Sequence, residues 1–349
     1  MLKIGIIGLP NAGKSTLFNA LVEKTQARVE PRPFTTIDKN AGVVNVPDET
    51  LVELAKIHNI SKITYAQIEF VDIAGLIKGA HQGEGLGNEF LGHIKEVDLI
   101  LHVLRYFKSD SVPHIHTKID PEEDFQIVNQ ELILKDIETV EKRLSKKKIS
   151  KEEKEFLQKL FEHLNQGKMA KDFPFEKEEK EMVKELFLLT MKDQVIVANI
   201  GEEEIERKFD RIDGFEVIPI SAKLEAELSL LPWVEKRKFM KEVGLKESAR
   251  RKIIRACYDK LGAITFYTIA KGKEARAWSV KKGTNVYEAA GKIHTDFQKK
   301  FIKAFIVSAK ELISIGSWQR ALQQGKAQIV GRDYVVKEGD VIEIKLRGK

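Results

Sequence analysis

A glycine-rich loop that follows a short strand constrains this chain more than any other feature. Residues Leu2–Ile7 have the pattern of a buried strand, and Gly8-Leu-Pro-Asn-Ala-Gly-Lys-Ser15 comes directly after them. Apolar residues then recur at helical spacing over Thr16–Val22. A strand, a glycine loop and a helix in this order form a phosphate-binding loop, because backbone N–H groups and the helix N-terminus both point at the phosphates. The chain is therefore predicted to bind a nucleoside triphosphate.

Four more strands are predicted to extend this unit into a doubly wound α/β domain. Each is a short run of mainly apolar residues, as expected for parallel strands that are covered on both faces. They are Gln67–Asp72, Val97–Leu104, Val195–Asn199 and Glu216–Pro219.

The segment 130–192 interrupts this alternation with a charged helical stretch. Ile133, Ile137, Val140 and Leu144 form a heptad seam, and three apolar residues between 156 and 164 supply a returning face. We expect an antiparallel helical hairpin that projects from the α/β domain. The alternative is a pair of ordinary crossover helices packed on the sheet.

From Ala263 onward, short strand patterns alternate with brief helical ones, which indicates a separate α+β module. A connecting helix is expected over Arg250–Tyr258. The strand candidates are Ile264–Ala270, Ala275–Val280, Ala304–Ser308, Gln328–Val330 and Val341–Leu346. The predicted domains are residues 1–129 together with 193–262, the insertion 130–192, and the module 263–349.

The phosphate loop and the strand that ends at Asp72 carry the residues expected to bind phosphate and metal. Lys14 is expected to neutralise the β- and γ-phosphates, and the Ser15 hydroxyl to ligate Mg²⁺. Asp72 adds a carboxylate to the metal shell, Gly75 offers a backbone N–H to the γ-phosphate, and Thr36 is expected to complete the shell. The nucleotide contacts expected in the loop are Asn11, Ala12, Gly13, Lys14, Ser15 and Thr16.

The group that positions the attacking water is less evident. The glycine-rich segment Gly75–Gly87 is predicted to be a switch loop, or alternatively a plain surface loop. Within it, Leu76 replaces the glutamine that many GTPases use to orient the water. His114 and His116, beyond the third strand, are candidates because imidazole deprotonates water near neutral pH, and His81 is a weaker one. A hydrogen-bonded loop histidine without a catalytic role is the alternative.

The base-binding segments favour adenine. Asn199-Ile-Gly-Glu202 stands where a guanine-specific enzyme carries Asn-Lys-x-Asp, so the lysine that covers the ring is missing and the acid is one methylene longer. The carboxylate that binds guanine accepts hydrogen bonds from its N1–H and N2 amine, and adenine has an acceptor at N1 instead. Ser221-Ala-Lys223 is the loop expected beneath the base. The expected base contacts are Asn199, Ile200, Glu202, Ser221, Ala222 and Lys223.

Charge is distributed unevenly along the chain. Residues 251–349 hold 21 Lys and Arg against 9 Asp and Glu, whereas the remainder holds 38 against 44. A basic C-terminal third predicts a polyanionic partner such as RNA. The alternative is a solvated basic surface without a partner.

Composition narrows the setting. A single cysteine, Cys257, excludes a disulfide framework and a zinc site built from cysteines, and it fits a reducing cytosol. No run of 18 apolar residues is present, and Met1–Pro10 lacks the pattern of a signal peptide. We expect a cytoplasmic protein, a monomer, with neither a membrane nor DNA as partner.

Together these motifs resemble the YchF or Obg-like ATPase family, which belongs to the TRAFAC class of P-loop proteins. The segments that carry the resemblance are Gly8–Thr16, Val71–Ala80, Gly83–Asn88, Asn129–Leu134, Arg276–Trp278 and Ala289-Ala-Gly-Lys-Ile-His-Thr-Asp-Phe297. The resemblance implies a P-loop G domain, a coiled-coil insertion and a C-terminal TGS domain.

The same resemblance implies Mg²⁺-dependent hydrolysis of ATP to ADP, with the base read through Asn199 and Glu202. It implies that His114, six residues before Asp120, is the catalytic histidine. It also implies association with the ribosome, through the large subunit and its rRNA, in the regulation of translation or a stress response.

Some residues depart from the family pattern, and two rival functions stay open. Thr35, Asp38-Lys39, Thr117 and Phe305 differ from the residues expected at those positions, and none of them touches the phosphate chemistry. One rival function is an Obg-type GTPase. The other is a nucleotide-gated binding module whose hydrolysis is incidental, favoured by the missing glutamine.

Overall fold

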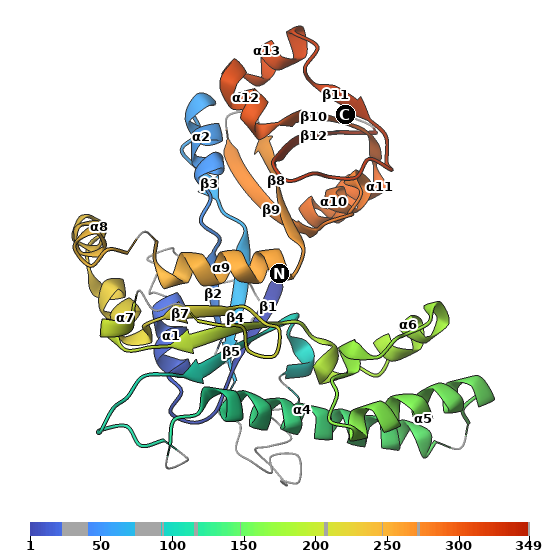
Figure 1. Ribbon diagram of the computed structural model, residues 1–349. Helices are drawn as coiled ribbons and strands as arrows, with labels where there is room; N and C mark the ends of the chain where they lie inside the picture. Colours follow the sequence, from blue (N-terminus) through green and yellow to red (C-terminus); the bar gives the residue numbers. More distant parts are fainter. Residues whose placement is uncertain are drawn as a thin grey trace. The chain divides into compact units, whose positions relative to one another are not determined.

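The chain forms two compact units, shown in the computed structural model of Figure 1. The P-loop unit comprises Leu2–Val43 and Glu69–Cys257, and the C-terminal unit comprises Val44–Ile68 and Tyr258–Lys349, together with Met1. The residues that the structure describes are 1–22, 41–73, 92, 94–114, 118–146, 148–205, 209–245, 247–270 and 273–347. Among these, no helix has the length and apolar character needed to cross a membrane.

The P-loop unit is built on a sheet with the strand order β2-β4-β1-β5-β6-β7. Strand β1 pairs in parallel with β5, β5 with β6, and β6 with β7. Every residue of the central strand β5 is buried. The strands are β1 (Leu2–Ile7), β2 (Ala41–Asn45), β4 (Gln67–Asp72), β5 (Leu99–Arg105), β6 (Gln194–Asn199) and β7 (Val217–Ile220). The predicted α/β fold is confirmed, and the predicted strands lie within two residues of the observed bounds.

Helices connect and flank these strands. They are α1 (Lys14–Val22), α4 (Pro121–Leu144), α5 (Lys151–Asn165), α6 (Lys177–Lys184), α7 (Ala222–Leu230), α8 (Trp233–Glu242) and α9 (Ala249–Lys260). Single 3₁₀ turns lie at η2 (Ala170–Asp172), η3 (Leu189–Met191) and η4 (Glu202–Glu204). The first turn of α1 follows the glycine loop directly, so its N-terminus is available to phosphate.

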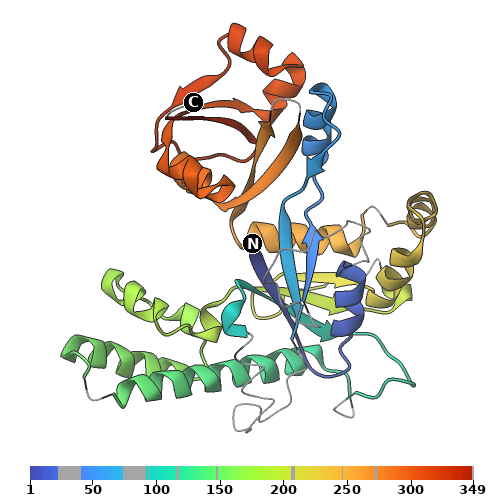
Figure 2. The same cartoon turned by 180° about the vertical axis from the view of Figure 1, so that it is seen from behind.

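The long helix α4 has features of both alternatives for the helical insertion, a projecting hairpin and a crossover helix packed on the sheet. Its first half packs on the sheet, where the Phe125 ring stacks on His102 of β5 with centroids 5.4 Å apart. Its second half pairs with α5, as both views show (Figures 1 and 2). Of the predicted apolar seam, Ile133 and Val140 are buried, and Ile137 and Leu144 are partly buried in the same cluster. The helix starts at Pro121 rather than near residue 130, because Asp120 accepts a hydrogen bond from the Glu123 N–H (3.0 Å) and caps it.

The C-terminal unit contains a second sheet with the order β11-β10-β12-β8-β9-β3. Its strands are β3 (Ile63–Thr64), β8 (Ala263–Ala270), β9 (Glu274–Lys281), β10 (Phe301–Ser308), β11 (Gln328–Val330) and β12 (Asp340–Leu346). Its helices are α2 (Glu49–Ile57), α10 (Val286–Ile293), α11 (Thr295–Lys299), α12 (Ala309–Ile315) and α13 (Trp318–Gln323). The predicted α+β character of this part is confirmed.

One segment lies in a different unit from the one that the sequence suggested. Residues 44–68 were assigned to the first domain, yet they pack with the C-terminal unit. Strand β3 pairs with β9, and Leu51 and Leu54 of α2 share an apolar core with Tyr267. The Tyr267 hydroxyl also donates to the Asp48 carboxylate (3.2 Å), which caps α2. The other predicted domain boundaries stay predictions.

Candidate functional site

The loop between β1 and α1 can be closed only by glycine at two positions. Gly8 has a φ of +148°, and a Cβ there would lie 2.3 Å from the carbonyl oxygen of Val103 in β5. Gly13 has a φ of +92°, and a Cβ there would lie 2.2 Å from the amide nitrogen of Asn199. At both positions any residue with a side chain is therefore excluded, by the backbone conformation and by contact with a neighbouring strand.

Lys14 is the first residue of α1 and is largely buried. It is 7% exposed, and its Nζ donates a hydrogen bond to the carbonyl oxygen of Leu9, 2.9 Å away. Burial lowers the pKa of Lys14 to about 8, and the charge of Asp72 opposes this shift in part. An ammonium group that has lost most of its hydration gains strongly from a phosphate oxygen placed beside it.

Asp72 and Ser15 are the two described residues among those expected to ligate a metal. Asp72 ends β4, and its buried Oδ1 has no hydrogen-bond partner among the described residues. Ser15 is exposed in the first turn of α1. A carboxylate oxygen without a partner and an accessible hydroxyl are suitable for Mg²⁺, which takes few protein ligands and completes its shell with phosphates and water. Thr36 and Gly75 lie outside the described residues.

Asn199, at the end of β6, joins the phosphate loop to the loop expected beneath the base. Its side-chain Nδ2 donates to the Ala12 carbonyl (2.9 Å), and its Oδ1 accepts from the Ala222 N–H (3.0 Å). The residue is only 4% exposed. Its side chain therefore joins the phosphate loop to the loop expected beneath the base. The sequence had suggested Asn199 only as a base contact.

The other base-side residues divide into buried and exposed ones. Ile200 is buried and donates its N–H to the carbonyl oxygen of Ile220 (2.9 Å). Glu202 and Lys223 are accessible and form an ion pair of 3.0 Å, which raises the pKa of Lys223. Ser221 caps α7 by accepting from the Leu224 N–H. Glu202 and Lys223 are thus the two expected base contacts whose side chains are exposed.

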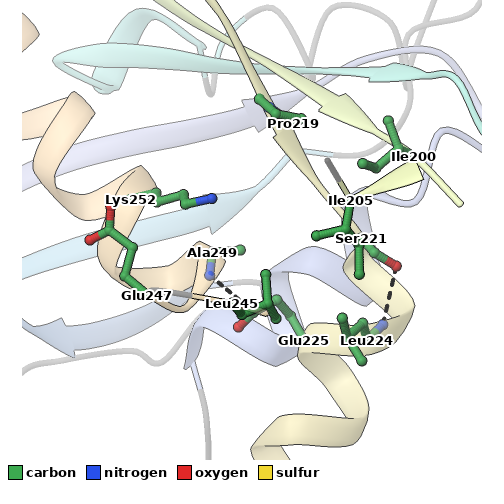
Figure 3. Close-up of a pocket in the computed structure, with 10 residues that line it drawn as sticks. All are labelled: Ile200, Ile205, Pro219, Ser221, Leu224, Glu225, Leu245, Glu247, Ala249 and Lys252. Atoms are coloured by element: carbon green, nitrogen blue, oxygen red, sulfur yellow. Dashed lines mark hydrogen bonds between the residues drawn. The ribbon is translucent and has the colours of Figure 1, made fainter. Parts of the chain in front are cut away.

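A small pocket lies behind these loops (Figure 3). On its far side the Glu225 carboxylate accepts a hydrogen bond of 2.5 Å from the Ala249 N–H, which ties α7 to the start of α9. Its lining consists of Ile200, Ile205, Pro219, Ser221, Leu224, Glu225, Leu245, Glu247, Ala249 and Lys252. Ile200 is therefore one of the apolar residues of a lining that also contains Ser221, Glu225, Glu247 and Lys252.

His114 is held by a carboxylate on α4. Its Nε2 lies 3.0 Å from Oδ2 of Asp124, and both side chains are largely buried. The preceding residue, Pro113, presents its carbonyl oxygen to Nδ2 of Asn11 in the phosphate loop, 3.0 Å away. The structure therefore brings the His114 loop to the phosphate loop. His81, His116 and Leu76 lie outside the described residues.

The sequence analysis missed Asp124 and Arg105 as members of this site. Arg105 ends β5 and donates to the carbonyls of Val112 and Pro113 (2.7 and 3.1 Å). Arg105 could have been found from its position, because it follows six apolar or buried residues of one strand. A charged residue at the end of a buried strand must find buried partners. Asp124, on the first turn of a helix, gave no comparable signal.

Comparisons with known proteins place this site in a family. Residues 3–154 match the family model described as "50S ribosome-binding GTPase", and residues 263–347 match YchF-GTPase_C, described as a protein of unknown function. The "Ribosome-binding ATPase YchF" of Bacillus subtilis (strain 168) is 43% identical over 99% of both chains. That of Escherichia coli O157:H7 is 41% identical over 97% of this chain and 98% of its own.

A solved structure covers the same length. The "Schizosaccharomyces pombe YchF GTPase" is 32% identical, spans 99% of this chain and 97% of its own, and superposes with a TM-score of 0.85. Similarity of this extent covers both compact units.

Asn199→Ala tests the bridge between the two nucleotide-facing loops. The substitution leaves the Ala12 carbonyl and the Ala222 N–H without their partner, and each such loss costs about 1–3 kcal/mol. We expect nucleoside triphosphate affinity, measured by calorimetry, to fall about 10- to 100-fold. The control is Asn165→Ala at the exposed end of α5. Unchanged affinity in Asn199→Ala would contradict the bridging role.

Proposed function

The chain belongs to the YchF family of P-loop nucleotide hydrolases, and from this premise we propose that it hydrolyses ATP to ADP and phosphate and acts on ribosomes. The observation that carries the proposal is the phosphate loop, where Lys14 is buried beside the charge of Asp72. No alternative use of a desolvated lysine at a helix N-terminus fits as well as binding phosphate.

Three groups are proposed to hold the triphosphate and its metal. The N–H groups of residues 11–16 cradle the phosphates, and Lys14 exchanges its bond to the Leu9 carbonyl for the β- and γ-oxygens. Ser15 and Asp72 would hold Mg²⁺, with Thr36 as a further ligand and Gly75 as a donor to the γ-phosphate. Bound with the nucleotide, Mg²⁺ supplies charge neutralisation at the β- and γ-phosphate oxygens.

His114 is proposed to position the attacking water. The Asp124 carboxylate lies within hydrogen-bond distance of Nε2 of His114 and orients the ring. The imidazole then orients the attacking water or accepts a proton from it. This arrangement performs the work of the glutamine that Leu76 replaces.

ATP is proposed as the substrate because Asn199-Ile-Gly-Glu202 lacks the guanine pattern. The names of the relatives differ on this point: the two bacterial proteins are called ATPases and the S. pombe protein a GTPase. An Obg-type GTPase is therefore the second candidate. Ile200 supports ATP, because it presents no amine above a base where the guanine pattern has a lysine.

The ribosome is proposed as the partner, since both bacterial relatives are named ribosome-binding ATPases. We propose contact with rRNA of the large subunit, made by a monomer in the cytoplasm, and a role in translation or a stress response. The C-terminal module, proposed to be a TGS domain, carries the excess of basic residues between 251 and 349. The lysines between α4 and α5 are the competing contact.

Lys14→Ala tests the proposed hydrolysis. Loss of the ammonium group removes the counter-charge of the β- and γ-phosphates, so we expect phosphate release from ATP to fall at least 100-fold, on the order of 3 kcal/mol. Lys3→Ala, at a partly exposed lysine near the start of β1, is the control. Phosphate release at the wild-type rate in Lys14→Ala would overturn the assignment.

The lowered pKa of Lys14 adds a pH dependence to the same test. Below pH 8 the free protein already carries the ammonium, whereas above it the proton must be taken up on binding. Wild-type ATP affinity is therefore expected to be flat below about pH 8 and to fall up to ~10-fold per pH unit above it. Calorimetry in buffers of different ionisation enthalpy measures the proton uptake.

Nucleotide preference is tested by Glu202→Asp. In the wild type we expect ATP to bind more tightly than GTP. Shortening the acid restores the length that reads guanine, so the GTP-to-ATP affinity ratio should rise. The substitution is cleaner than one at Ile200, which is buried. Glu203→Asp, on the same turn, is the control. A wild-type preference for GTP of tenfold, about 1.4 kcal/mol, would favour the GTPase.

Ribosome docking is tested by charge removal. Deleting residues 264–349 would remove the partners with which α2 shares its apolar core, so substitution is preferable. Glutamine at Lys281, Lys282, Lys299 and Lys300 should weaken ribosome co-sedimentation about tenfold and flatten its salt dependence, because fewer counterions are released. Glutamine at Lys146 and Lys148, between α4 and α5, tests the competing contact. Ribosome co-sedimentation that is unchanged by salt and equal to wild type in both variants would refute RNA docking.

A further inference from the structure

Arg105 is a buried cation whose partners all lie in one loop. It is 1% exposed. Its Nε donates to the Phe107 carbonyl (3.2 Å), Nη2 to that of Val112 (2.7 Å) and Nη1 to that of Pro113 (3.1 Å). The guanidinium also lies 4.4 Å from the centre of the Phe107 ring. Three backbone acceptors and a ring face compensate much of the cost of burying this charge.

The three carbonyls belong to the segment that connects β5 to His114. Phe107 is near its beginning, and Val112 and Pro113 are the two residues directly before the histidine. The guanidinium is a rigid planar fork, so two successive carbonyls bound to it are fixed in direction as well as in distance. The direction in which the chain reaches His114 is therefore set by Arg105.

The same segment is anchored to the phosphate loop. The Pro113 carbonyl accepts a second hydrogen bond, from Nδ2 of Asn11 (3.0 Å). Asn11 itself has a φ of +63°, the left-handed conformation that asparagine tolerates better than most residues. One carbonyl oxygen thus joins the end of β5, the phosphate loop and the residue preceding His114.

Asp124 completes the arrangement from the other side. Its carboxylate contacts His114 and its charge acts on Arg105, where it opposes the lowering of the Arg105 pKa by burial. The histidine therefore lies between a loop fixed by an arginine and a helix that presents a carboxylate.

We propose that Arg105 is a positioning residue for hydrolysis, which fixes the loop before His114 so that the imidazole faces the bound γ-phosphate. This inference rests on the proposed role of His114 as the group that positions water. Arg105 is buried and donates to three carbonyls of this loop, so on this proposal it acts only through the histidine. A displacement of about 1 Å at a reacting group is enough to lower a rate about 100-fold.

The test is a double-mutant cycle on the full-length chain. Arg105→Lys keeps the charge and loses the fork, and His114→Ala removes the imidazole. Single-turnover ATP hydrolysis and ATP affinity are measured for the wild type, both single variants and the double variant. Arg143→Lys, whose Nε donates to Glu153 in the α4–α5 hairpin, is the matched control.

The expected result is a rate loss without a binding loss. Arg105→Lys should lower the hydrolysis rate about 10- to 100-fold while ATP affinity stays within about twofold. In the double variant the rate should equal that of His114→Ala, because a residue that acts only through the histidine has no further effect once the histidine is gone. Arg143→Lys should leave the rate unchanged.

The outcomes separate the two proposals. If His114→Ala hydrolyses ATP normally, the proposed role of the histidine fails. If His114→Ala is slow but Arg105→Lys is normal, or if the two losses multiply in the double variant, the histidine stands and the inference about Arg105 is overturned.

A second variant decides the matter if Arg105→Lys does not fold. One glycine inserted between the exposed residues Asp110 and Ser111 lengthens the loop upstream of both anchored carbonyls. If the Arg105 bonds set the position of His114, this insertion should change the hydrolysis rate less than about threefold. A loss of about 100-fold with Arg105 intact would show that loop length sets the position instead.

Discussion

The hydrogen bonds of Asn199 are the interaction on which the rest of the site depends. Its side chain spans the Ala12 carbonyl and the Ala222 N–H, and its own carbonyl oxygen accepts from the N–H groups of Tyr106 and Phe107. One residue therefore joins the phosphate loop, the base-side loop and the start of the His114 loop. Its closeness also explains why Gly13 must be glycine, since a Cβ there would collide with the Asn199 amide.

Two buried cations show how the fold prepares for a charged ligand. Arg105 donates to three backbone carbonyls, and its role is to fix backbone. Among the described residues, Lys14 donates to one backbone carbonyl and faces the charge of Asp72, and burial still lowers its pKa to about 8. The two cations therefore differ in how many acceptors the described protein offers them. A triphosphate would supply further acceptors to Lys14.

Sequence patterns predicted what is local and missed what depends on packing between distant segments. Strand β1, the glycine loop and α1 are continuous in sequence, so their order alone identified the phosphate site. Residues 44–68 carry no local sign of which sheet they join, and the pairing of β3 with β9 and the core that α2 shares with Tyr267 assign them. The Asp124 contact with His114 likewise depends on where α4 begins, which is set by its cap at Asp120.

Helix α4 connects the candidate site to the rest of the P-loop unit through packing and hydrogen bonds. Asp124, in its first turn, contacts His114, and Phe125 and Val128 pack on the sheet side. Further along, Asp136 accepts three hydrogen bonds from Leu189 and Thr190, which fixes the helix to η3. A helix of 24 residues is about 36 Å long. One continuous element therefore carries both the carboxylate that contacts His114 and the residues that pair with α5.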